Sequence, residues 1–132
     1  MAAIIEARQK KPIHTTRELA LIIEKVCGRG RSSKIHPATK VFQALRMYVN
    51  HELNNITGFL SGALQVLKPD GLLVCISFHS LEDRIVKQFF KEKADEGKLE
   101  IITKRVVVPT AQEIAQNPSS RSAKLRVARF VG

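Results

Sequence analysis

The sequence has no tryptophan, one tyrosine and only two cysteines among its 132 residues. The cysteines, Cys27 and Cys75, lie far apart and form no Cys-x-x-Cys pair, which disfavours a disulfide scaffold and favours the reducing cytoplasm. No apolar run reaches the roughly 18 residues of a membrane span, and residues 1–8 are too charged for a signal peptide. The four histidines and two cysteines lack metal-ligand spacing. We therefore expect a cytoplasmic protein with no membrane partner and no bound metal.

A glycine-rich cofactor loop is also missing. Such a loop has to follow a strand directly, so that the backbone can approach the ligand closely. The run Gly28–Arg31 follows a predicted helix instead, and its arginines suit phosphate contact or plain solvation. The sequence therefore predicts no cofactor-binding residues within this chain.

Positive charge is the feature of composition that stands out. Lysine and arginine outnumber acidic residues by 22 to 12, which gives a formal net charge of +10. So large an excess favours an anionic partner, with RNA or DNA ahead of a membrane surface. The alternative is a basic protein whose charges are only solvated. The length suits one domain, and a hydrophobic content of 44% supports a globular core.

Residues 72–78 predict a buried strand, because their apolar side chains do not alternate with polar ones. This pattern is typical of a parallel strand that is covered on both faces. The turn Pro69–Gly71 precedes it, and a helix over residues 81–94 follows it. Ser80 and Asp83 match an S-x-x-D capping box at the start of that helix. The segment therefore indicates the strand-to-helix crossing of an α/β protein.

The polar residues at this crossing are Ser77, His79 and Ser80. In open α/β sheets, ligands bind outside the carboxyl ends of the strands, so these side chains lie where chemistry is usually done. His79 is equally well explained as a polar cap. A Ser-His hydrolase is disfavoured, because the three residues are too close in sequence and no G-x-S-x-G motif is present.

The rest of the chain predicts further helices and strands. Capping boxes, such as T-x-x-E at Thr15–Glu18, and apolar periodicity indicate helices over residues 2–11, 15–27, 37–53, 55–67 and 110–116 and strands over residues 99–108 and 123–131. Strands 72–78 and 99–108 should form a right-handed β-α-β unit and run parallel. The last strand should lie at a sheet edge or be wet on one face, because Lys124 and Arg126 alternate with apolar residues.

Three long motifs occur in order along the chain. They are Lys34–Arg46 with Val49-Asn50 and Glu52-Leu53, then Ile76–Lys87, and then Asn117-Pro118 with Arg121–Arg126. Together they resemble the bacterial 16S ribosomal RNA cytosine N4-methyltransferases, the family called ribosomal small subunit methyltransferase H or MraW. The resemblance covers nearly the whole chain, since Thr15–Val26 also looks like the end of that family's helical insertion.

This resemblance implies an α/β fold, the C-terminal part of a class I Rossmann-like methyltransferase. Residues 1–36 would be the end of the helical insertion domain and a basic loop, and residues 37–132 the C-terminal part of the Rossmann-like domain. The family moves a methyl group from S-adenosylmethionine to N4 of a cytosine near the ribosomal decoding site. The family's cofactor contacts lie outside the part that this chain resembles, so the chain alone is expected to be inactive.

The roles of the candidate site residues are predicted from their position and charge. We expect Ser77, His79 and Ser80 to line or support the cytosine side of the cleft, and Glu82, Asp83 and Arg84 to orient them. RNA phosphates would be held by basic residues from two regions: Lys34, His36, Lys40, Arg46, Arg121, Lys124 and Arg126. For His36, a structural role as a helix cap is favoured over substrate contact. The partner would be 16S rRNA or the small ribosomal subunit.

Two other interpretations remain open. The chain could be a non-catalytic basic module that binds RNA or the ribosome, or a truncated product. A truncated sheet would expose the edge of strand 72–78 and apolar helix faces, so self-association or a dimer is expected in that case.

Overall fold

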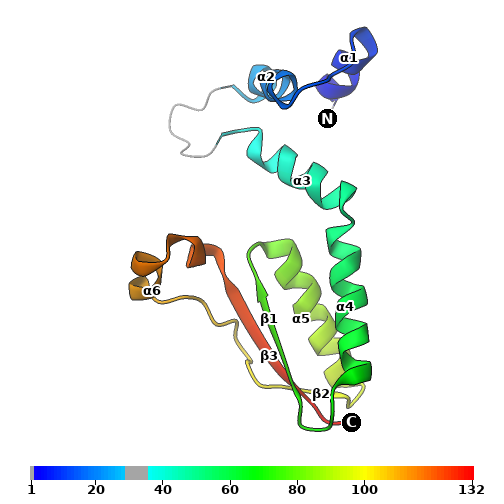
Figure 1. Cartoon of the computed structure of the whole chain (residues 1–132), viewed down its shortest axis with the longest axis vertical. Helices are drawn as coiled ribbons and strands as arrows, with labels where there is room; N and C mark the ends of the chain where they lie inside the picture. The colour runs from blue at the N-terminus through cyan, green and yellow to red at the C-terminus, as the bar shows by residue number, and fades with distance from the viewer. Residues whose placement is uncertain (1, 29–35) are drawn as a thin grey trace. The chain divides into compact units, whose positions relative to one another are not determined.

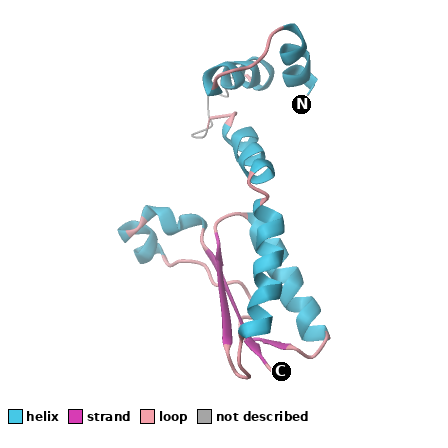
Figure 2. Cartoon of the chain, turned by 45° about the vertical axis from the view of Figure 1, so that its right-hand side comes forward, coloured by secondary structure: helices cyan, strands magenta, loops and turns pink. Residues whose placement is uncertain are grey.

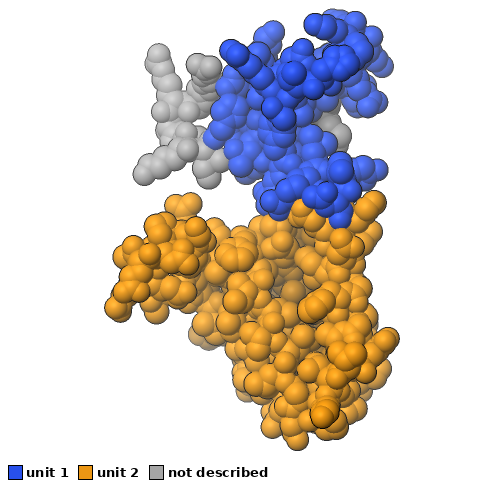
Figure 3. Space-filling model, viewed as in Figure 1, with its two compact units in different colours: residues 1–50 blue, residues 51–132 orange. Residues whose placement is uncertain are grey.

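The computed structural model describes residues 2–28 and 36–132, and the chain divides into two compact units, residues 1–50 and 51–132 (Figure 3). Lys34 lies outside the described residues, as do Arg29 and Arg31. The RNA contact expected of Lys34 therefore stays a prediction, and the choice between phosphate contact and solvation for Arg29 and Arg31 stays open.

The first unit is helical and contains α1 (Ala2–Lys10), α2 (Thr16–Cys27) and α3 (Thr39–Val49) (Figure 1). The capping box predicted at the start of α2 is confirmed. Thr15 Oγ1 accepts a hydrogen bond from the Glu18 amide at 3.2 Å, and Glu18 Oε2 accepts one from the Thr15 amide at 3.0 Å. The carboxylate also accepts the amide of His14, and these backbone hydrogen bonds lower the pKa of Glu18.

α3 is shorter than the predicted helix over residues 37–53. It ends at Val49, and His51 has a left-handed φ of 52°, a conformation that a continuing helix does not allow. Apolar periodicity predicts that this helix buries Val41, Phe42, Leu45, Val49 and Leu53. This stripe is wrong for Leu45 and Val49, which are exposed, while Met47 is buried.

The second unit holds the sheet. Its elements are α4 (Glu52–Val66), β1 (Leu72–Ser77), α5 (Ser80–Asp95), β2 (Leu99–Ile101), α6 (Ala111–Gln116), a 3₁₀ turn η1 (Pro118–Ser122) and β3 (Lys124–Phe130). The predicted strand–helix–strand order around α5 is confirmed. The turn before β1 is also confirmed, and Gly97 ends the α5 region with a φ of 76°.

The three strands have the order β1-β3-β2, and β3 is antiparallel to both neighbours (Figure 2). β1 and β2 therefore run parallel to each other, as predicted, but they do not pair. Of the two predicted positions for the last strand, the alternative of one wet face stays a prediction, and the edge is wrong, because β3 is the central strand. Its charged residues are compatible with that position since Arg126 and Arg129 pair with carboxylates of the same unit.

β2 is much shorter than the predicted strand over residues 99–108. The amides of Ile102 and Thr103 both donate to the carbonyl of Val127, at 3.0 and 3.2 Å, which disrupts the regular ladder. Pairing returns only as the isolated bridge between Val107 and Leu125. The β-branched composition of this segment therefore gives extended chain rather than a continuous strand.

The core of the second unit lies between the sheet and the helices α4 and α5. It is built from apolar side chains of all three strands and both helices: Leu60, Leu73, Val86, Phe89, Phe90, Leu99 and Ala128. The other face of β1 is different, because Leu72, Val74 and Ile76 are 57%, 52% and 59% exposed. The expectation that both faces of this strand are covered is wrong for the described chain.

Candidate functional site

The turn between β1 and α5, residues 77–82, is called the elbow below. α5 is capped by His79 rather than by Ser80, so the predicted S-x-x-D box is wrong by one residue. His79 Nδ1 accepts a hydrogen bond from the Glu82 amide at 3.4 Å, while Glu82 Oε2 accepts from the amides of His79 at 3.4 Å and Phe78 at 3.0 Å. One carboxylate thus satisfies two amides that the end of the strand and the start of the helix leave unpaired.

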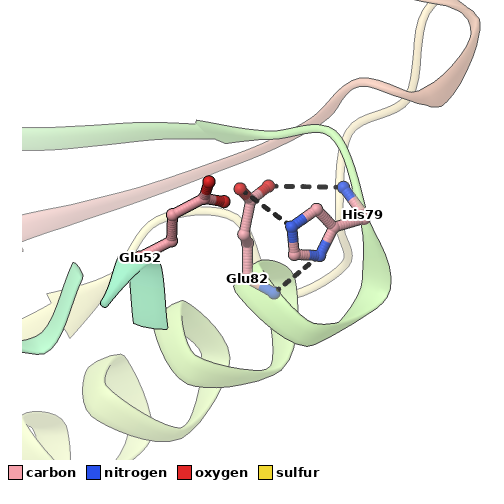
Figure 4. A group of neighbouring side chains, drawn as sticks. All are labelled: Glu52, His79 and Glu82. Carbon is pink, nitrogen blue, oxygen red and sulfur yellow. Dashed lines mark hydrogen bonds and ion pairs between the residues drawn. The ribbon is translucent and has the colours of Figure 1, made fainter. Parts of the chain in front are cut away.

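This cap fixes the tautomer of the His79 ring. Because Nδ1 accepts the Glu82 amide, the proton of the neutral ring is on Nε2. Nε2 lies 3.0 Å from Glu82 Oε1 (Figure 4). Nε2 is buried and has no hydrogen-bond partner among the described residues, so its contact with Glu82 Oε1 is electrostatic. The ring therefore presents a polarised N–H to a carboxylate.

Glu52, in the first turn of α4, joins this pair. Oxygen atoms of Glu52 and Glu82 and a ring nitrogen of His79 lie within 4.8 Å of one another (Figure 4). Sequence reasoning assigned no role to Glu52, which is far from the elbow in the chain. The available signal was Glu52-Leu53, which belongs to the segment quoted for the family resemblance.

The same three residues have the donor types of a metal site, but the cap argues against that use. A histidine that binds a metal through Nε2 carries its proton on Nδ1 and donates it to an acceptor. Here Nδ1 faces the Glu82 amide, which is itself a donor. In this arrangement His79 and Glu82 form a hydrogen-bonded cap, and the carboxylate of Glu52 lies beside it.

Asp83 and Arg126 tie the first turn of α5 to β3. Arg126 Nε donates to Asp83 Oδ1 at 2.7 Å, and its Nη2 donates to Oδ2 at 3.1 Å. Both side chains are largely buried, with 15% and 12% exposure. The hydrogen bonds from Arg126 hold the pKa of Asp83 below its ordinary value. This contact holds the start of α5 in place. It also occupies the guanidinium of Arg126, whose expected contact with RNA stays a prediction.

A groove of about 480 Å³ opens beside the elbow, between α4 and β1. Its polar end is formed by Asn55, Ser77 and Glu82, and the rest of its lining is apolar apart from the thiol of Cys75. Ser77 is 6% exposed. Lys124 is its register partner on β3, so a cation lies across from the serine at the carboxyl end of β1.

The other predicted site residues lie in both units. Ser80, Arg84 and Arg121 are exposed, the first two in the first turns of α5 and the third on η1. His36, Lys40 and Arg46 belong to the first unit and are exposed as well. His36 makes structural contacts, because Nδ1 accepts the amide of Ala38 at 3.1 Å and Nε2 lies 2.7 Å from Glu24 Oε1, but the N-cap of α3 is Ala38 rather than His36.

A substitution in the cap tests how much the cap contributes to the stability of the fold. Glu82→Gln keeps the shape but removes the charge that receives the amides of Phe78 and His79. We expect the free energy of unfolding to fall by about 1–2 kcal/mol, measured by urea titration. Hydrogen exchange at these two amides should quicken. Glu92→Gln, on the exposed part of the same helix, is the control and should leave their exchange unchanged.

Comparison with known proteins adds the decisive observation. The model of the MraW methylase family matches residues 1–131. The chain belongs to the MraW methylase family. The expected resemblance is confirmed, and it includes the segments that build the elbow.

Curated relatives in the MraW methylase family are longer than this chain. The chain is 58% identical over 126 residues to "Ribosomal RNA small subunit methyltransferase H" of Coprothermobacter proteolyticus, covering 95% of the chain and 41% of that relative. Proteins of the same name from Sulfurihydrogenibium sp. and Persephonella marina are 51% and 50% identical, with 98% of the chain and 44% and 45% of the relatives covered. The chain thus spans less than half the length of these relatives. Among its described residues, no helix has the length and apolar character needed to cross a membrane.

Proposed function

We propose that this chain is the C-terminal part of a class I Rossmann-like enzyme that methylates N4 of a cytosine in 16S rRNA, near the decoding site. The observation that carries the proposal is the elbow at the carboxyl end of β1, in a chain that belongs to the MraW methylase family. The names of its relatives support an rRNA substrate. The enzyme would act in the cytoplasm, on 16S rRNA or the small ribosomal subunit.

The sheet supports the Rossmann-like assignment. β1, α5 and β2 form a crossover between two parallel strands, and β3 lies antiparallel between them. Mixed sheets of this kind are common among doubly wound folds. In this proposal residues 1–36 are the end of a helical insertion domain and residues 37–132 belong to the Rossmann-like domain.

The described residues do not fit an S-adenosylmethionine site. The amides at the start of α5 are engaged by the side chains of His79 and Glu82, and the glycine before β1, Gly71, closes a turn against Lys68. No glycine-rich loop follows β1. The methyl donor would therefore be held by the part of the enzyme that this chain does not span, and the chain alone would be inactive.

The residues of this chain would act on the cytosine. Its exocyclic amine is a poor nucleophile, because its lone pair is delocalised into the ring. The site therefore has to align the amine with the methyl group and supply acceptors for its N–H groups. The carboxylates of Glu52 and Glu82 and the hydroxyl of Ser77 supply acceptors near the polar end of the groove. Within the elbow, His79 orients Glu82, and Ser80 lies next to His79. The Asp83–Arg126 pair fixes the start of α5. The supporting role expected for Arg84 stays a prediction. The base must leave its stack to reach them.

Positive charge around the elbow would hold RNA phosphates. Lys124 lies across from Ser77, and Arg84 and Arg121 are exposed in the same unit. His36, Lys40 and Arg46 would contribute from the first unit, together with Lys34. The net charge of +10 supports the same partner.

The test uses a chimera in which this chain replaces the matching segment of the Coprothermobacter proteolyticus relative. The chimera should bind S-adenosylmethionine by calorimetry and methylate small ribosomal subunits, whereas the chain alone should do neither. His79→Asn is the informative variant, because asparagine is also a good helix cap. We expect unchanged unfolding but roughly 100-fold slower methylation, the scale of a misplaced reacting group.

Ser77→Ala should behave in the same way, and Gln88→Ala, exposed on α5, is the matched control. Wild-type rates in both elbow variants would contradict the site assignment. If the chain alone bound RNA and the chimera bound no S-adenosylmethionine, the alternative would be favoured. That alternative, a basic RNA-binding module without catalysis, is supported by the net charge.

A further inference from the structure

Phe78 is a large apolar side chain among the polar residues of the elbow. All six phenylalanines lie in the described part of the chain, and two of them, Phe59 and Phe78, are exposed. Phe78 is 55% exposed and stands directly between Ser77 and His79. A ring that is left in water gives up the free energy that its burial would supply. Phe78 therefore contributes little to the stability of this chain.

The position of Phe78 differs from that of the exposed side chains within β1. Leu72, Val74 and Ile76 lie inside the strand, on the face that this chain leaves uncovered. β1 ends at Ser77, and Phe78 lies in the bend after it. Ligands of open α/β sheets bind at such carboxyl ends. Phe78 thus belongs to the elbow rather than to the body of the strand.

The backbone of Phe78 is held by the cap of α5. Its amide donates a hydrogen bond to Glu82 Oε2 at 3.0 Å, and the amide of His79 donates to the same oxygen at 3.4 Å. These two hydrogen bonds fix the backbone from which the ring projects, which lowers the entropy lost on binding. Phe78 also lines the groove together with Ser77 and Glu82. An aromatic ring and hydrogen-bond acceptors therefore meet at one place.

A nucleobase that has left its stack needs both of these features. Its faces lose their stacking neighbours, and its edge presents hydrogen-bonding groups that were paired before. Phe78 offers an aromatic surface, while Glu52, Ser77 and Glu82 offer oxygen acceptors for an amine. Cytosine presents an N4 amine at this edge, whereas uracil presents a carbonyl oxygen that carboxylates repel. The combination favours a flipped cytosine.

We propose that Phe78 is a substrate-binding residue whose ring stacks on the flipped cytosine and holds the amine toward the carboxylates of Glu52 and Glu82. This inference rests on the proposed function and deepens it, because it names the side chain that replaces the stacking lost in the RNA. The contact uses only residues of this chain and does not require the methyl donor. It can therefore be measured separately from methylation.

Two substitutions in the chimera separate stacking from apolar packing. Phe78→Leu keeps an apolar side chain without an aromatic face, so kcat/KM for small ribosomal subunits should fall about tenfold, within the scale of one base–aromatic stack. Phe78→Tyr keeps the ring and should stay within about threefold of the wild-type value. Urea titration should show little change in stability for either variant.

Phe59→Leu is the matched control for Phe78→Leu. Phe59 is exposed and lines the same groove, but it lies two helical turns from Glu52, about 10 Å along α4. A base held at the elbow does not reach it. Phe59→Leu should therefore leave kcat/KM unchanged.

Photochemical cross-linking measures the contact directly. A short single-stranded RNA that carries one iodocytosine is irradiated with the chain and, separately, with the chimera, and peptide mass spectrometry locates the cross-link. We expect the cross-link at Phe78, and its loss in Phe78→Leu but not in Phe59→Leu. Unlabelled RNA with cytosine at that position should compete better than the same RNA with uracil.

Several results would overturn the stacking role. They are an unchanged kcat/KM in Phe78→Leu, equal losses in Phe78→Leu and Phe59→Leu, a loss in Phe78→Leu that unfolding of the chimera accounts for, and cross-links at other side chains only. The proposed function fails separately. A chimera that neither binds S-adenosylmethionine nor methylates RNA, but cross-links at Phe78, refutes the proposed function and leaves the base contact intact. Methylation by the chimera with a wild-type rate in Phe78→Leu refutes the stacking role alone.

Discussion

Phe90→Ala should lower the free energy of unfolding of the second unit by about 3–5 kcal/mol, the range for removing a buried phenylalanine. Phe90 is 2% exposed and lies in the cluster that joins α4, α5 and the sheet. The substitution loses the transfer free energy of the ring and leaves a cavity that a small core cannot close. Far-UV circular dichroism in urea is the suitable measurement, because the chain has no tryptophan for fluorescence.

Phe59→Ala is the matched control, with the same change at a side chain that is 67% exposed. Phe59→Ala should lower the free energy of unfolding by well under half as much. Whole domains are stable by only about 5–15 kcal/mol, so Phe90→Ala should remove a large share of the stability of the second unit and lower its urea midpoint clearly. Equal effects of the two substitutions would show that the core is not centred between the sheet and the two helices.

Local patterns in the sequence predict the elements well. The capping box at Thr15–Glu18, the helix after the elbow and the strand at 72–77 each depend on residues within one or two turns of each other. Their hydrogen bonds and side-chain spacing are short-range, so composition and periodicity contain the necessary information. The elbow was recognised as a candidate site for the same reason.

The choice between neighbouring polar residues is not local. His79, Ser80 and Asp83 all offer side chains at the helix start, and Asp83 is drawn away by Arg126, which is distant in the chain. That leaves Glu82 to complete the cap with His79. A serine-based box is the better prediction from sequence frequencies, and a contact across the fold overrides it.

Strand order and coverage depend on partners that periodicity does not identify. Nothing within residues 124–130 distinguishes a central strand from an edge strand. Arg126, which suggests an edge, is neutralised by a carboxylate from α5, and Arg129 pairs with one from β2. Residues 72–77 have the apolar pattern of a strand covered on both faces, while this chain covers one face. Glu52 was missed likewise, since only the fold brings it to His79.

Asp83→Asn should destabilise the second unit by about 3–5 kcal/mol, because removing one partner leaves the buried guanidinium of Arg126 without its counter-charge. The pH dependence has a definite sign. Arg126 lowers the pKa of Asp83 below its ordinary value of 3.8, so the pair stabilises the fold above that value. This stability is lost as the pH falls through the folded-state pKa. Urea titrations at pH 3 and pH 7 should show the difference between wild type and variant shrinking in acid.

Glu100→Gln is the control, since Glu100 pairs with Arg129 at an exposed position and should have a much smaller effect. The double variant Asp83→Leu with Arg126→Met separates stability from positioning. Replacing both ions by apolar groups often restores or raises stability. If it does so here while the chimera still loses methylation, the pair contributes to the site beyond stability, either by holding the helix start with Glu82 and His79 or through the RNA contact expected of Arg126. Asp83→Leu alone, which keeps Arg126, separates the two, because only the positioning role predicts that its methylation falls. Recovery of both stability and methylation would instead show that any well-packed contact between α5 and β3 is sufficient.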